Sequence, residues 1–128
     1  MSDELKTKMT RLAERLLERT SDGGVRWEET DRSDFFTAVL EGGSVVIGQA
    51  GGFWKGTRFE FTVRNDRGLT IETLAVPRDQ PPVAPGESPV ADENMEALRN
   101  VLLSLYEAAR RSALEVDKTL DLLLGQLE

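Results

Sequence analysis

The residues with the clearest capacity for chemistry are carboxylates. They form two groups along the chain: Glu28, Glu29, Asp31 and Asp34, then Asp117 and Asp121. Converging carboxylates could hold Ca²⁺ or Mg²⁺, or act as an acid–base pair in a glycosidase-like site. Neither group follows the twelve-residue calcium-loop pattern, and acidic side chains are usually solvated. We therefore expect no metal and no catalytic site here, and an enzyme built on Glu28 or Glu29 ranks last among our hypotheses.

A second unusual segment is rich in glycine and runs from residue 48 to residue 57, with the sequence GQAGGFWKGT. A phosphate-binding loop needs its lysine directly after a glycine and ahead of a helix, whereas Lys55 precedes Gly56 and a strand pattern follows. A long hairpin loop with an aromatic tip explains the segment at least as well. Because exposed aromatic residues often anchor interfaces, we name Phe53, Trp54 and Lys55 as a tentative contact site, although structural packing is the more common role of a tryptophan.

The chain contains no Cys and no His. These absences remove thiolate nucleophiles, disulfides, thiolate zinc sites and imidazole general bases. We expect no enzymatic activity and no cofactor.

The net charge and the pattern of residues 1–20 limit the kinds of partner and the location that we expect. The 16 basic and 23 acidic residues give a net charge of -7, which disfavours binding to nucleic acid. Residues 1–20 alternate basic and acidic side chains without a continuous apolar core, so they predict neither a secretory signal nor a membrane span. A bacterial protein of the cytoplasm is the expectation.

Apolar spacing predicts the elements. Intervals of three and four predict an amphipathic helix over 3–20, and alternation predicts a five-stranded antiparallel meander over 25–77, with strands near 25–29, 34–41, 44–50, 58–65 and 69–76. Glycine-containing tight turns are expected at 41–44 and 65–68. A change of parity in the last strand predicts a β-bulge near Thr73. The strands at 34–41 and 44–50 carry apolar residues on both parities, which predicts cover on both faces of the sheet.

The C-terminal part begins with a Pro-rich linker at 78–89 and continues as a helical segment over 90–127. A straight helix over 92–127 would be about 54 Å long, about twice the 27 Å of an eight-residue strand. We therefore predict either a bend near Arg110–Ser112 or contact of the distal half with another chain. The distal leucines need cover, and we weigh packing against the first helix and a homodimer contact equally. Tentative interaction residues here are Leu120, Leu123, Leu124 and Leu127. Arg110 and Arg111 are expected to form local salt bridges with Glu107 and Glu115.

The order of these features resembles a group of small uncharacterised bacterial proteins. The shared features are an amphipathic first helix, a tryptophan after a glycine turn (24–27), an Asp-x-Gly hairpin (66–68), and a Leu-Tyr-x-x-Ala-Arg helix (105–110). The resemblance covers nearly the whole chain and implies a helix–sheet–helix fold, but no activity.

We predict a single α+β domain: a five-stranded antiparallel meander with the N- and C-terminal helices packed on one face. The favoured function is a non-enzymatic protein–protein interaction or accessory module that self-associates through the C-terminal helix, with its protein partner unknown. One alternative is a small-ligand binder with a cavity lined by Phe36, Ala38, Gly48, Phe59 and Tyr106. Another is a protein like the type III secretion chaperones, which are similar in charge and mass, although their helix inserted within the sheet has no counterpart here.

Overall fold

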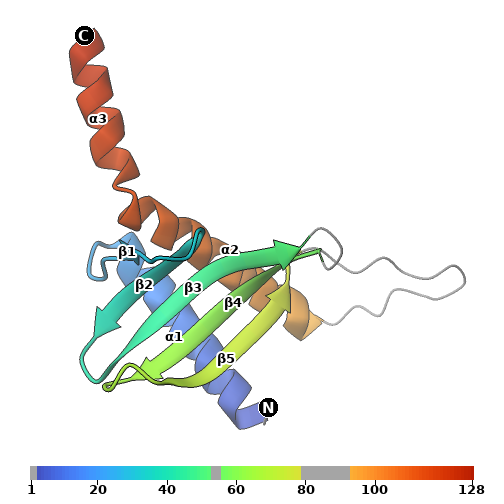
Figure 1. Ribbon diagram of the computed structural model, residues 1–128. Helices are drawn as coiled ribbons and strands as arrows, with labels where there is room; N and C mark the ends of the chain where they lie inside the picture. The colour runs from blue at the N-terminus through green and yellow to red at the C-terminus, as the bar shows by residue number, and fades with distance from the viewer. Residues whose placement is uncertain (1–2, 53–55, 79–92) are drawn as a thin grey trace, which may run out of the picture.

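The computed structural model describes residues 3–52, 56–78 and 93–128. Its elements, drawn in Figure 1, are α1 (Asp3–Ser21), β1 (Glu28–Glu29), β2 (Phe35–Leu40), β3 (Gly43–Gly52), β4 (Gly56–Asn65), β5 (Thr70–Pro77), α2 (Glu93–Ala113) and α3 (Val116–Leu127). The predicted α+β class is confirmed. Most of the predicted linker at 78–89 lies outside the described residues.

The five strands form one antiparallel sheet in the order of the sequence, β1-β2-β3-β4-β5. Both predicted hairpin turns are present. Gly42 has φ 89° and Gly68 has φ 80°, conformations that side chains other than glycine rarely adopt. In the second turn, the Asn65 side-chain oxygen accepts hydrogen bonds from the backbone N–H groups of Arg67 at 2.9 Å and Leu69 at 3.1 Å. This local chemistry fixes the register of β4 against β5.

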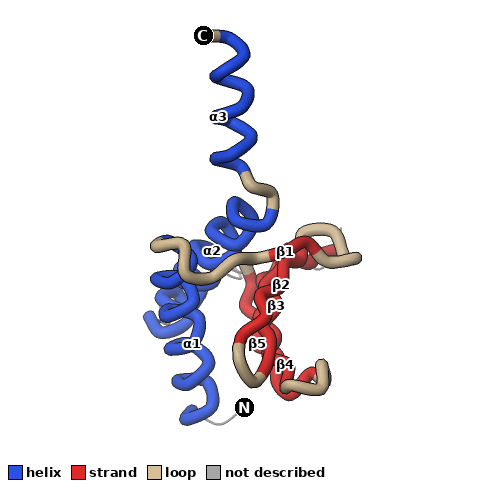
Figure 2. The backbone as a smooth tube through the Cα atoms, turned by 90° about the vertical axis from the view of Figure 1, so that its left-hand side faces the viewer, coloured by secondary structure: helices blue, strands red, loops and turns tan. Residues whose placement is uncertain are grey.

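Helices α1 and α2 lie on the same side of the sheet, as Figure 2 shows. α2 crosses all five strands and α1 packs against α2. The alternating strands send one set of side chains toward the helices. The core that results contains Met9, Ala13, Leu16, Trp27, Phe36, Ala38, Val45, Ile47, Phe59, Phe61, Leu74, Val76, Leu98, Leu102, Leu105, Tyr106 and Ala109.

Trp27 joins the sheet edge to both helices. Its side chain is 3% exposed. Its backbone N–H donates to Ser112 Oγ of α2 at 3.0 Å, and its indole Nε1–H donates to Thr20 Oγ1 of α1 at 2.9 Å. Because both donors are satisfied, the burial of the indole carries no unpaired polar group.

The other face of the sheet carries no helix among the described residues. The prediction that β2 and β3 would be covered on both faces is therefore wrong for the described part of the chain. Phe35 and Val46 lie on this helix-free face and are nevertheless only 5% and 6% exposed. The Arg32 side chain, described below, lies over the Phe35 ring.

The irregularity in β5 occurs earlier than predicted. Val63 pairs with Glu72 and Arg64 pairs with Thr70, so Ile71 is the extra residue instead of Thr73. The bulge leaves both Leu69 and Ile71 58% exposed. Beyond it, Leu74 and Val76 point to the core.

The C-terminal helical segment also breaks later than predicted. Residues 110–112 belong to α2, and the break falls at Glu115, which adopts a left-handed conformation with φ 49° and ψ 47°. α3 then rises away from the rest of the molecule (Figures 1 and 2). It does not pack on α1, so the predicted intramolecular cover of its leucines is wrong.

Candidate interaction surface

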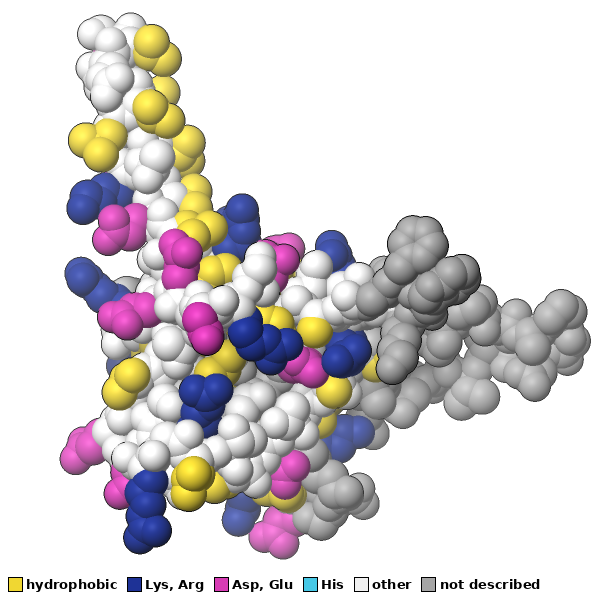
Figure 3. Space-filling model, in the orientation of Figure 1, with side chains coloured by type: hydrophobic (Ala, Val, Ile, Leu, Met, Phe, Trp, Pro, Cys, Tyr) yellow, Lys and Arg dark blue, Asp and Glu magenta, His cyan; other side chains and the backbone are white. Residues whose placement is uncertain are grey.

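α3 is an apolar helix with no core of its own. None of its residues is buried. Its leucines are exposed by 51% at Leu120, 61% at Leu122, 51% at Leu123, 54% at Leu124 and 85% at Leu127. Figure 3 shows most of the hydrophobic side chains of α3 in a line along one side of the helix, with one on the opposite side. Four of the seven residues predicted as interaction sites are thus brought together on one exposed element.

The apolar residues of α3 follow a regular spacing. Val116, Leu120, Leu123 and Leu127 are four, three and four residues apart, and we call these four residues the seam. At about 100° per residue they fall within roughly 60° of the helix circumference. Leu124 widens the seam on one side, whereas Leu122 lies far around the helix from it. This is the pattern by which one helix packs against another.

The two flanks of the seam differ in charge. Asp117, Asp121 and Glu128 fall on the flank next to Leu124, and none of them forms an ion pair with a described residue. The opposite flank carries Thr119 and Gln126 and is uncharged. A partner of α3 would therefore meet an apolar strip with an acidic border on one side.

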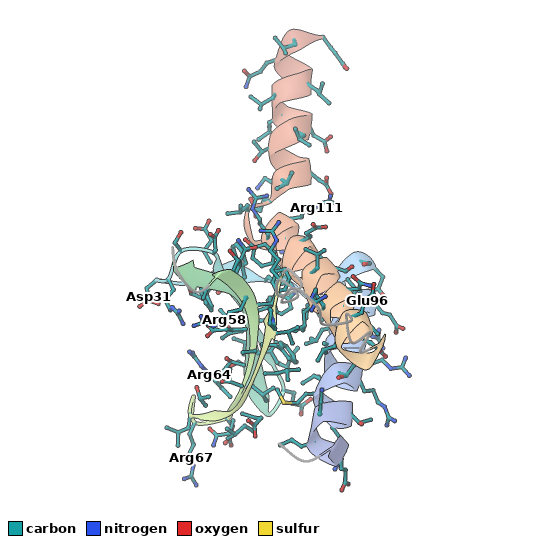
Figure 4. All side chains as sticks on the ribbon, turned by 90° about the vertical axis from the view of Figure 1, so that its right-hand side faces the viewer. Asp31, Arg58, Arg64, Arg67, Glu96 and Arg111 are labelled. Carbon is teal, nitrogen blue, oxygen red and sulfur yellow. The ribbon has the colours of Figure 1, made fainter. Side chains whose placement is uncertain are left out.

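Arg110 and Arg111 lie in the last turn of α2, at the base of α3, and Figure 4 labels Arg111 there. The predicted salt bridges of these arginines to Glu107 and Glu115 are absent from the described residues. Glu115 pairs instead with Lys118, with its carboxylate 3.6 Å from the lysine Nζ. Two exposed cations therefore border the base of the apolar helix.

The other predicted contact site, Phe53, Trp54 and Lys55, lies outside the described residues. The strands that lead to it are long and regular: β3 and β4 pair from Gly43 with Asn65 up to Gly52 with Gly56. The predicted long loop over 48–57 is therefore wrong, because β3 and β4 continue through most of this segment and only residues 53–55 separate them. The role of its tip stays a prediction.

On the helix-free face, one compact cluster was not foreseen from the sequence. The Phe35 ring lies over Gly48, which has no side chain to obstruct it. The Arg32 guanidinium carbon lies 3.8 Å from the centre of that ring, a cation–π geometry. Glu60 binds Arg32 at 3.9 Å and Arg58 at 3.3 Å. Figure 4 places Arg58 and Arg64 on this side of the sheet. The Arg32 side chain therefore covers one face of the Phe35 ring, and Glu60 pairs with the charge of Arg32.

Asp34 and Tyr106 form a second polar contact, between the start of β2 and α2. Burial raises the pKa of the Tyr106 hydroxyl above its ordinary value of 10.0, and the Asp34 carboxylate, which accepts a hydrogen bond from it, raises this pKa further. The positive charges of Arg110 and Arg78 oppose the shift. Asp34 has φ 64°, a strained conformation for a residue other than glycine. The contact ties the β2 entry to α2.

The carboxylates singled out in the sequence do not converge. Glu28 and Glu29 lie on the edge strand β1, opposite Thr37 and Phe36, while Asp34 is engaged with Tyr106. Among the described residues, no three acidic side chains are arranged to hold a metal ion.

The residues expected to line a ligand cavity belong to two different places. The Tyr106 ring lies 6.0 Å from that of Phe36 and 5.8 Å from that of Phe59, centre to centre, so these rings pack against one another within the core. Ala38 is buried beside them. Gly48 lies under Phe35, on the helix-free face.

Within the described residues, no helix combines the length and the apolar character that crossing a membrane requires. Comparison of the chain with protein-family models, with curated proteins and with solved structures gives no match. The resemblance to small bacterial proteins therefore stays a prediction.

Proposed function

We propose that this protein is an interaction module and that α3 is the element through which it binds other protein chains. The observation that carries the proposal is that a helix rich in leucine has no buried residue. α3 holds five leucines, and each is more than half exposed. Monomeric proteins rarely leave a contiguous apolar strip of this kind in water.

The energetic argument favours a covered state. Burial of a fully exposed leucine side chain contributes roughly 1.5–3 kcal/mol. Because Leu120, Leu123 and Leu124 are about half exposed and Leu127 is 85% exposed, covering the four contributes roughly 4–7 kcal/mol before ordering costs. The described residues of the body bury none of these leucines, since α3 contains no buried residue. A partner chain packed on α3 would supply this cover.

The length of α3 supports the same conclusion. It has 12 residues and, within the part of the chain that the structure describes, it meets the body at its base, through α2. Isolated helices shorter than about 12–15 residues are marginal in water even with favourable sequences. A helix of this length becomes stable when its apolar face packs, so binding and the ordering of α3 would be coupled.

Matched substitutions on α3 test the proposal. Immobilised full-length chain is incubated with cell lysate, and the retained proteins, added copies of this chain included, are quantified. Leu123→Asp places a charge in the seam, whereas Leu122→Asp places the same charge away from it. We expect Leu123→Asp to lose the retained proteins and Leu122→Asp to keep them, with the thermal unfolding of both unchanged. Equal retention by both variants would contradict the proposal.

A further inference from the structure

We infer that the chain covering α3 is a second copy of this protein, whose own α3 packs antiparallel to the first across a two-fold axis. The inference rests on the proposed function and names its partner. It is carried by three features of the described residues: the symmetry of the seam, the uncharged flank beside it, and the position of the free cations.

The spacing of the seam is the same in both directions. Val116, Leu120, Leu123 and Leu127 are separated by four, three and four residues, so reversing the helix end for end returns the same pattern. A two-fold contact needs this property, because the same patch must serve both subunits. With the axis between residues 121 and 122, Leu120 faces Leu123 of the second copy and Val116 faces Leu127.

The flanks agree with this arrangement. In an antiparallel pair each flank meets the same flank of the second helix. Thr119 then lies near Gln126 of the second copy, so the uncharged flanks meet through two polar side chains. On the other flank, Asp117 lies near Leu124 of the second copy instead of an acid, and Asp121 lies outside the seam.

Charge is complementary at the two ends of the pair. Reversal of the second helix brings its Glu128 to the level of residue 115, at the end of α3 that follows Arg110 and Arg111 in the chain. Arg110 and Arg111 are exposed and have no ion pair among the described residues, and the same is true of Glu128. The two-fold axis makes the contact twice. A parallel pair would instead place the two copies of Glu128 at one end and the arginines of both copies at the other.

The size of the contact sets the strength to expect. α3 has 12 residues and is therefore about 18 Å long and about 10 Å wide. The contact is much smaller than a standard interface of roughly 800 Å² per partner. We expect a reversible dimer with a Kd in the micromolar range. The two bodies lie at opposite ends of the helix pair, so they do not obstruct it.

Sedimentation of the purified full chain tests the partner. The mass of the wild-type chain should rise from monomer to dimer as concentration increases. Leu123→Asp should stay monomeric at every concentration, and the control Leu122→Asp should dimerise like the wild type. A wild-type chain that stays monomeric throughout would overturn the inference.

Disulfide cross-linking tests the orientation, because the chain has no cysteine of its own. In an antiparallel pair the two copies of residue 116 are about 16 Å apart, whereas a disulfide needs Cα atoms about 4.4–6.8 Å apart. A mixture of Val116→Cys and Leu127→Cys chains should therefore form mixed disulfide dimers, and neither variant should cross-link alone. Efficient cross-linking of each variant with itself would overturn the antiparallel pair.

The outcomes separate the inference from the proposed function. A monomeric chain that still retains other proteins through Leu123 overturns the second copy as partner and leaves α3 as a binding element. A monomeric chain whose retention is insensitive to both aspartate variants overturns both.

Discussion

One methyl group added at Gly48 probes the packing of the helix-free face. A Cβ atom at this position would fall on the ring of Phe35. That ring is 5% exposed and has the Arg32 guanidinium on it, 3.8 Å from its centre. In Gly48→Ala the ring must therefore leave its site and separate from Arg32.

The expected cost follows from two opposing terms. Exposure of the displaced phenyl ring costs up to about 1.5–3 kcal/mol. Replacement of a glycine within a strand by alanine contributes about 0.5–1 kcal/mol in the opposite direction. We expect Gly48→Ala to lower the free energy of unfolding by about 1–2 kcal/mol.

A double-mutant cycle with Phe35→Ala isolates the contact. Urea unfolding of the four chains at one protein concentration, followed by tryptophan fluorescence, gives the four free energies. In the Phe35→Ala background, Gly48→Ala should be neutral or slightly stabilising, because the ring it displaces is gone. The coupling energy should be about 1 kcal/mol or more. An equal cost of Gly48→Ala in both backgrounds would refute the reasoning.

Three further predictions concern α2 and α3. Tyr106 is the chain's single tyrosine, so ultraviolet titration reports the ionisation of this hydroxyl alone. The midpoint of the titration should lie above 10.0. Asp34→Asn should lower this midpoint, because the Asp34 carboxylate helps to raise the pKa of Tyr106. As pH rises above about 10 the unfolded tyrosine ionises first, so the free energy of unfolding should fall there, and Tyr106→Phe should remove this fall; a midpoint unmoved by Asp34→Asn would refute the contact. Leu102→Ala should cost about 2–5 kcal/mol in denaturant unfolding, because Leu102 is 0% exposed. Leu124→Ala should change the free energy of unfolding of the monomer by less than about 0.5 kcal/mol, and a loss as large as that of Leu102→Ala would show that α3 packs on its own body.

The sheet could be predicted from the sequence because its signals are local. Glycines stand where the backbone needs a positive φ, at Gly42 and Gly68, and alternation in β4 assigns Phe59 and Phe61 to one face. Turn chemistry and a period of two residues are properties of short segments, so no distant contact is required to read them.

The features that could not be predicted depend on contacts between distant segments or on a single backbone conformation. The arrangement of Arg32 over Phe35 requires the strand pairing that puts Gly48 beneath the ring. The hydrogen bond between Tyr106 and Asp34 joins α2 to the start of β2. Both need the assembled fold.

The direction of α3 is set by Glu115 alone. Its left-handed conformation, with φ 49°, turns the chain out of α2. Glutamate does not favour this conformation, and the apolar spacing continues on both sides of residue 115. The position of the break therefore could not be predicted from the sequence. The leucines were identified from the sequence, whereas the absence of any cover for them within the described chain required the structure.

Amide hydrogen exchange of α3, measured as a function of protein concentration, shows whether a second copy covers the seam. A 12-residue helix with nothing packed against it should open readily and exchange fast. If a second copy covers the seam, protection of residues 117–127 should increase with concentration, while protection of the sheet stays constant. Exchange in α3 that is fast and independent of concentration, in a chain that binds no other protein, would contradict the account.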